Sequence, residues 1–202
     1  MSLNIIQHLY ADIIQTSRLE WFAVITAFIC IYLAAKQHIL NWPISILSVL
    51  AYAYLFYQAK LYGEMALQGY YLFTAIYGWY YWLKVKHENQ KPIVRLSPRS
   101  MGLATLATAC LSALLGLFLH HYTDTDVAFI DGTLASISFT AQFLMTRKVL
   151  QNWLMWVIVD ILYIPLFIYK GYLLTAVLYA ILTIIAWKGY LDWKRAWKNN
   201  QC

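Results

Sequence analysis

Long apolar stretches, separated by short polar or basic segments, run through almost the whole chain. A helix needs about 20 apolar residues to cross the hydrocarbon core of a bilayer, with a range of roughly 17–25. The pattern predicts seven membrane-spanning helices, at residues 20–36, 42–59, 63–83, 101–121, 131–147, 152–169 and 171–190. Ahead of them, residues 1–19 carry apolar side chains at helical spacing among polar ones, which predicts an amphipathic helix at the outer membrane surface.

The second half of the chain repeats part of the first. Residues 41–84 align without a gap with residues 152–195, at an offset of 111, and nine of the 44 positions are identical. In the first copy the identical residues are Asn41, Trp42, Tyr52, Leu55, Phe56, Leu67, Ala75, Gly78 and Trp82. Internal repeats are typical of small membrane transporters, which bind their solute near the bilayer midplane between the repeats.

The number of spans fixes the relation between the two copies. Four spans precede the fifth, so the fifth begins on the same side of the membrane as the first, and the copies are parallel. We therefore predict an all-α integral membrane protein, with two parallel three-helix repeats joined by a fourth helix. The predicted parts are a first repeat at 20–83, a basic linker and connecting helix at 84–121, a second repeat at 122–195 and a cytoplasmic tail at 196–202.

The basic residues orient these spans. Of the 15 Lys and Arg residues, 12 fall on the side where spans one, three, five and seven end, and three fall on the other side. Because positively charged loops stay in the cytoplasm, we expect the N-terminus outside and the C-terminus inside. This distribution also accounts for the sequence pI of about 9.1 without a nucleic-acid partner.

Composition agrees with a membrane protein. The chain is 62% hydrophobic and 12% charged, against roughly 25% charged in an average soluble domain. Nine Trp and 17 Tyr residues suit interfacial belts and a stacking pocket. The three cysteines, Cys30, Cys110 and Cys202, are scattered, so no disulfide framework or metal spacing is expected. The N-terminus lacks the pattern of a cleaved signal peptide.

Asp160 is the most informative polar residue, because it lies in the middle of the sixth span. A charged Asp at a helix centre costs about 2.5–3.5 kcal/mol on insertion scales. Asn152, Trp156 and Tyr163 share its face, since the four residues lie at i, i+4, i+8 and i+11. An amide, an indole, a carboxyl group and a phenol suit a flat, cationic solute with hydroxyl groups. The alternatives are a structural hydrogen bond or a protonated side chain for Asp160, and aromatic helix packing for Trp156.

The third span carries two further candidates, Gln68 and Tyr71, on the side that also bears Ala75 and Gly78. The amide of Gln68 needs a hydrogen-bond partner in an apolar phase, from a solute or from a neighbouring helix.

Other chemistries lack their signatures. The sequence has no phosphate-binding loop of the ATPase type, no His/Cys cluster at metal spacing, and no convincing pair of nucleophile and base. We therefore expect neither an enzyme nor a resident cofactor or metal ion.

The pieces LYGEMALQ, IYGWYYW and NWLMW resemble the PnuC family of bacterial vitamin transporters, and the resemblance covers nearly the whole chain. The helix order of two three-helix units joined by a fourth helix also matches this family, and is similar in architecture to the SWEET sugar transporters. The family's binding residues map to Gln68, Asn152 and Trp156. At the position of Asp160, nicotinamide riboside transporters of the family can have Asn.

The resemblance implies uptake across the bacterial inner membrane by facilitated diffusion, with a cytosolic kinase that traps the solute by phosphorylation. Family members carry nicotinamide riboside, a subgroup called PnuT carries thiamine, and a homotrimer is implied. Both solutes are planar cations with hydroxyl groups, so the choice between them stays open. A proton-coupled transporter of the same solutes and a polytopic membrane enzyme are the alternative functions.

Overall fold

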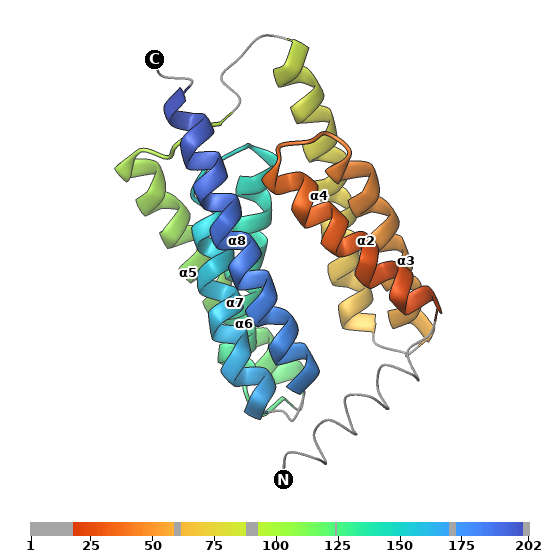
Figure 1. Ribbon diagram of the computed structural model, residues 1–202. Coiled ribbons are helices and arrows are strands. Elements are labelled where there is room, and N and C mark those ends of the chain that lie inside the picture. Colours follow the sequence, from red (N-terminus) through yellow and green to blue (C-terminus); the bar gives the residue numbers. More distant parts are fainter. Residues whose placement is uncertain (1–17, 59–61, 88–92, 124, 170–172, 200–202) are drawn as a thin grey trace. The chain divides into compact units, whose positions relative to one another are not determined.

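The structure is a computed structural model that describes residues 18–58, 62–87, 93–123, 125–169 and 173–199. Within these ranges the chain forms seven helices and no strand beyond one isolated β-bridge, so the predicted all-helical fold is confirmed. The helices are α2 (Arg18–Ala35), α3 (Asn41–Gln58), α4 (Tyr62–His87), α5 (Pro98–Tyr122), α6 (Ala128–Thr146), α7 (Asn152–Tyr169) and α8 (Leu173–Asn199) (Figure 1). The amphipathic helix predicted at 1–19 falls almost wholly outside the described residues.

Six of the seven helices begin and end within four residues of a predicted span. Helix α8 instead continues to Asn199, through the start of the predicted tail, and Asp192 and Arg195 on successive turns lie 3.8 Å apart there. Four helices of the described part, α5 to α8, are long and apolar enough to cross a membrane, whereas α2 and α3 supply the shorter apolar stretches Trp21–Ala35 and Asn41–Leu55.

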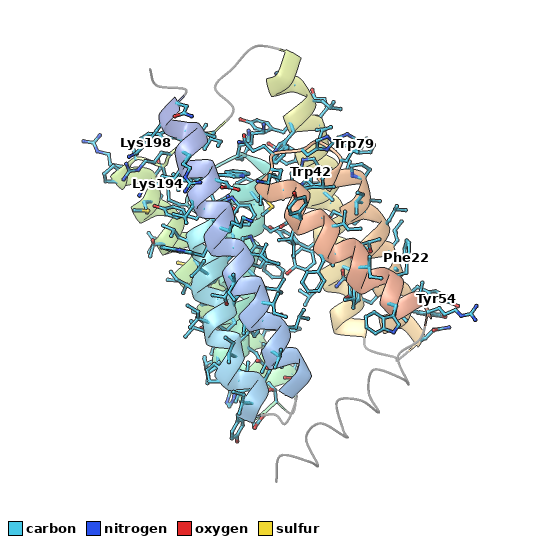
Figure 2. All side chains as sticks on the ribbon, in the orientation of Figure 1. Phe22, Trp42, Tyr54, Trp79, Lys194 and Lys198 are labelled. Carbon is cyan, nitrogen blue, oxygen red and sulfur yellow. The ribbon has the colours of Figure 1, made fainter. Side chains whose placement is uncertain are left out.

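The chain divides into two compact units, Met1–Trp79 and Tyr80–Cys202. In the first unit, α2 packs against α3, and the hydroxyl of Ser48 donates a hydrogen bond of 3.1 Å to the carbonyl of Ala23. The indole of Trp42, at the start of α3 (Figure 2), fills the space that a side chain at Gly78 of α4 would need. A glycine is required where the ring and the helix approach so closely.

In the second unit, α6 packs against α5 and α7, and α7 packs against α8. Helices α5 and α6 meet at two glycines, since a Cβ atom added at Gly132 would lie 2.6 Å from the backbone nitrogen of Gly116. The hydroxyls of Thr108 and Thr140 lie 2.8 Å apart across the same contact. Small residues and hydroxyl pairs are typical of helix contacts in membranes, where backbones pack closely.

The turns before α3 and α7 have the same geometry, 111 residues apart. Among the residues that the structure describes, Gln37 and Lys148 are the ones other than glycine with positive φ, at 55° and 54°. The Gln37 amide donates to the carbonyl of Ala34 and the Lys148 amide to that of Met145, each at 3.0 Å, and four further backbone hydrogen bonds correspond at the same offset. The sequence repeat is thus accompanied by a repeat in local structure. The arrangement of both copies as two parallel three-helix repeats stays a prediction.

The end of the basic linker is attached to the protein. Val94 forms a parallel bridge with Val149, in which the Val94 amide donates to the Lys148 carbonyl at 2.9 Å and the Leu150 amide donates to the Val94 carbonyl at 2.8 Å. The side chain of Gln151 adds two hydrogen bonds to the backbone of Leu96. The sequence alone predicted a basic linker here, and its charges and prolines give no sign of this backbone pairing.

Candidate functional site

Helix α7 carries four of the six predicted site residues along one stripe. Asn152 and Asp160 are buried, with 0% and 4% of their surfaces exposed, and Trp156 and Tyr163 are half-buried. The most exposed residues of α7 are aliphatic side chains and a terminal tyrosine, namely Ile158, Ile161, Leu162, Ile168 and Tyr169. The polar stripe therefore faces the protein rather than the surroundings, as expected for a solute site within a bundle.

Asp160 is buried without a counter-charge. Within the part of the chain that the structure describes, no hydrogen bond or ion pair reaches its carboxyl group. Burying a carboxylate is costly unless a partner compensates it. A cationic solute would supply the missing charge.

Two further side chains of the stripe, Asn152 and Trp156, also carry polar atoms without a hydrogen-bond partner among the described residues. The Asn152 amide donates to the Val149 carbonyl at 2.6 Å, so half of this side chain stabilises the turn before α7. Its carbonyl oxygen, and the indole nitrogen of Trp156, are buried and have no partner among the described residues. The stripe thus offers one hydrogen-bond acceptor and one donor, both on the N-terminal side of the Asp160 carboxyl group along α7.

Tyr163 belongs to a three-ring cluster that the sequence pattern did not reveal. Its ring centroid lies 5.5 Å from that of Phe167 and 4.8 Å from that of Tyr179 on α8, and the Phe167 and Tyr179 centroids are 5.1 Å apart. The alignment at offset 111 could have drawn attention to Tyr179, because it pairs this residue with Gln68.

Gln68 and Tyr71 lie on α4 in the first unit, and both are half-buried. The ring of Tyr71 meets that of Tyr70 edge-on at 5.8 Å, and the hydroxyl of Thr74 bonds back to the Tyr71 carbonyl at 3.0 Å. The structure brings together the four α7 residues in the second unit, and it describes the two α4 residues separately within the first. All six remain predicted site residues.

A cluster of tryptophans lies at the end of the second unit where α7 begins. The centroids of Trp82 and Trp153 are 6.1 and 5.6 Å from that of Trp193, and the Trp82 indole donates to the Thr146 carbonyl at 3.1 Å. The Lys148 ammonium group lies 4.5 Å above the Trp82 ring, and burial lowers the pKa of this lysine to about 8. This cluster is structural, since its tryptophans are almost completely buried.

Cations lie over rings at three further places in the second unit. Arg95 lies over Trp197 at 5.6 Å, Arg147 over Tyr81 at 4.9 Å and Lys194 over Tyr190 at 5.5 Å. All of these cations belong to the group of 12 assigned to the cytoplasmic side, and Figure 2 shows Lys194 and Lys198 near the end of α8. Aromatic rings beside Lys and Arg are typical of a membrane interface.

Among the described residues, no group of three or more His, Cys, Asp or Glu side chains could hold a metal ion. The candidate site consists of polar and aromatic side chains within apolar helices, and it includes the buried carboxyl group of Asp160. Buried polar groups among apolar, membrane-length helices are typical of the class of membrane transporters.

The chain belongs to the family described as the nicotinamide mononucleotide transporter family, whose model matches residues 17–195. The resemblance to PnuC proteins is thereby confirmed. The chain is 29% identical to the nicotinamide riboside transporter PnuC of Escherichia coli strain K12, over 88% of this chain and 85% of that protein. It is 27% identical to the nicotinamide riboside transporter PnuC of Neisseria mucosa, over 88% and 72% of the two chains.

Two further similarities extend this result. The chain is 26% identical to the riboflavin/roseoflavin transporter RibM of Streptomyces davaonensis, over 84% of this chain and 81% of that one. A crystal structure of the vitamin B3 transporter PnuC matches with a TM-score of 0.75 and 26% identity, over 96% of this chain and 88% of the other. The chain is therefore a multi-pass membrane transporter of the PnuC family.

Proposed function

We propose that this chain carries a planar cationic vitamin or vitamin precursor into the bacterial cell by facilitated diffusion. Nicotinamide riboside and thiamine are the candidate solutes, and a cytosolic kinase would trap either one by phosphorylation. The observation that carries the proposal is the carboxyl group of Asp160, which is buried on the same stripe as Trp156 and Tyr163 and lacks a cation among the described residues. A carboxylate beside aromatic faces favours a flat organic cation.

Two considerations divide the candidate solutes. Relatives named as nicotinamide riboside transporters support that solute. Asp160 stands where such transporters can have Asn, which supports thiamine. Riboflavin, the solute in the name of one relative, is uncharged, and a buried carboxyl group gives it no electrostatic advantage. We therefore expect little riboflavin transport.

The remaining parts of the proposal concern the mechanism. The positive residues favour an outer N-terminus and a cytoplasmic C-terminus. One three-helix unit would move against the other to expose the site alternately to each side. We also propose a homotrimer, which the family resemblance implies. The relatives are named as transporters, which argues against an enzyme.

The test is uptake into sealed liposomes that contain the purified protein. Thiamine, nicotinamide riboside and riboflavin are compared side by side, with Asp160→Asn and the control Asp192→Asn, whose carboxyl group lies near the end of α8 beside Arg195. We expect Asp160→Asn to raise the KM for the preferred cation at least about tenfold, which corresponds to about 1.4 kcal/mol. Asp192→Asn should transport normally.

Several outcomes would contradict parts of this proposal. Wild-type liposomes that take up none of the solutes would refute the function. Accumulation of unmodified solute above the outside concentration would exclude facilitated diffusion. If that accumulation required a pH gradient, the alternative of a proton-coupled transporter would replace facilitated diffusion. Nicotinamide riboside flux that survives in Asp160→Asn would make Asp160 a structural residue.

A further inference from the structure

We propose that Tyr163, Phe167 and Tyr179 form an aromatic stacking subsite for the planar ring of the solute, with Tyr179 as its contact residue on α8. This inference rests on the proposed function and extends it to a part of the site that the sequence stripe did not include. It begins with the closeness of the three rings, whose centroids all lie within 5.5 Å of one another.

Two rings of the cluster lie on the face of α7 that carries Asp160. Tyr163 follows Asp160 by three residues and Phe167 follows it by seven, so all three lie on one face of α7. Side chains three or four residues apart on a helix are neighbours, with Cβ atoms about 5–6 Å apart. A solute whose positive charge lies near the Asp160 carboxyl group therefore has aromatic surface within reach along the same helix.

The three rings of the cluster are more exposed than the aromatic pair that packs between the other ends of α7 and α8. Trp153 and Trp193 of that pair have only 1% and 0% of their surfaces exposed. Tyr163, Phe167 and Tyr179 are instead half-buried. Part of their surface stays accessible although the rings contact each other.

The sequence repeat distinguishes Tyr179 from the other two rings. At the offset of 111, Tyr163 and Phe167 correspond to the identical residues Tyr52 and Phe56, whereas Tyr179 corresponds to Gln68. Packing residues of the repeat are kept in both copies, for example the tryptophan that fills the space beside Gly78 and Gly189. The equivalent positions of Gln68 and Tyr179 instead differ, so the packing that both copies share does not require a ring at Tyr179.

The chemistry of the cluster favours a planar cation. The faces of phenyl and phenol rings carry negative potential, which attracts cations, and flat rings stack on them with centroids several ångströms apart. A cation without a flat ring would gain the attraction to Asp160 but lose the stacking. The two contributions can therefore be separated by experiment.

The experiment measures how well two cations compete with uptake of the transported solute. One probe is the planar 1-methylnicotinamide ion, and the other is the non-planar 1,1-dimethylpiperidinium ion. We compare wild type with Tyr179→Leu, which removes the ring, and Tyr179→Phe, which keeps it. Tyr122→Leu is the control, since Tyr122 contacts Phe118 at 5.0 Å on the exposed surface of α5.

Wild type should prefer the planar probe. Tyr179→Leu should reduce the preference for the planar probe about tenfold, whereas Tyr179→Phe and Tyr122→Leu should retain it. Asp160→Asn should weaken both probes by a similar factor, because charge is common to them. If Tyr179→Leu does not fold, as judged by its gel-filtration profile, Phe167→Leu takes its place with the same expectation.

The inference would be overturned by a wild type that transports its solute but does not distinguish the probes. A folded Tyr179→Leu with the wild-type preference would overturn it as well. Both results leave the proposed function intact, because uptake by the wild type is measured in the same liposomes. A wild type without uptake would refute the proposed function, and this inference with it.

Discussion

Replacement of Gly189 with alanine should destabilise the protein, although alanine is the better helix former. A Cβ atom at this position of α8 would lie 2.8 Å from the Cε3 atom of Trp153. The Trp153 ring cannot move away easily, because only 1% of its surface is exposed and it contacts Trp193. Overpacking of this kind costs about 1–3 kcal/mol, against a gain of about 1 kcal/mol from helix propensity.

Gly102 of α5 offers a matched control. A Cβ atom added there has no heavy atom within 4 Å, so Gly102→Ala should show only the gain in propensity. The two variants should therefore differ by about 1–3 kcal/mol in stability, the size of the overpacking term. At about 2–4 °C per kcal/mol for a chain of this size, the difference in Tm is several degrees.

The assay is thermal unfolding of the purified variants in detergent, followed by tryptophan fluorescence. Gly189→Ala should unfold at a lower temperature than wild type and Gly102→Ala at the same or a higher temperature. Gly78→Ala should behave like Gly189→Ala, because the Trp42 ring fills the equivalent space in the first unit. A Gly189→Ala variant as stable as Gly102→Ala would refute the reasoning, since Trp153 would then have room to shift.

Three further predictions concern the turns and helix contacts of the second unit. Lys148→Met should raise Tm near pH 7 and abolish a rise in wild-type Tm between about pH 8 and 10.5. The folded-state pKa of Lys148 is lowered to about 8 from 10.5 by burial, so in this window the unfolded chain binds more protons and stability increases with pH. Gln151→Ala should lose two hydrogen bonds to the backbone of Leu96 and about 1–2 kcal/mol, which hydrogen exchange at the linker would detect. Gly132→Ala should lower Tm more than Gly189→Ala, because its Cβ would meet the backbone of Gly116, which cannot rotate away.

Each of these predictions has a result that contradicts it. A wild-type Tm that is flat or falling between pH 8 and 10.5, relative to Lys148→Met, would show that the ammonium group is well solvated. Unchanged exchange at the linker in Gln151→Ala would mean that the bridge at Val94 suffices alone. A Gly132→Ala protein with wild-type stability would show that α5 and α6 are not in close contact.

Much of the helical architecture followed from hydropathy. The seven predicted spans correspond to seven helices. A run of about 20 apolar residues is long enough to cross a membrane, and as a helix it forms all of its backbone hydrogen bonds within itself while its apolar side chains face the lipid. The ends of α4 and α8 extend further than predicted, since polar residues continue a helix as readily outside a bilayer. The sequence repeat begins with the pair Asn–Trp at the start of α3 and of α7, whereas the shared hydrogen bonds of the turn before each helix became visible only in the structure.

The predicted site residues could be related to one another only where they share a helix. The spacing of Asn152, Trp156, Asp160 and Tyr163 requires one stripe on α7, whatever the neighbours are. Tyr179 could not be assigned to the same cluster, because helical spacing carries no information about which residue of α8 faces α7. The attachment of the linker at Val94 was likewise hidden, since backbone pairing between distant segments depends on tertiary packing.

The sequence by itself determined the fold class, the approximate helix bounds, the membrane setting and the family, because these depend on local hydrophobicity, spacing and short motifs. Only the tertiary structure decided that Asp160 is buried with no counter-charge among the described residues, that Trp153 occupies the space beside Gly189 and that Tyr179 completes a three-ring cluster with Tyr163. These features depend on contacts between helices, and such contacts arise from the three-dimensional packing of side chains that lie far apart along the chain.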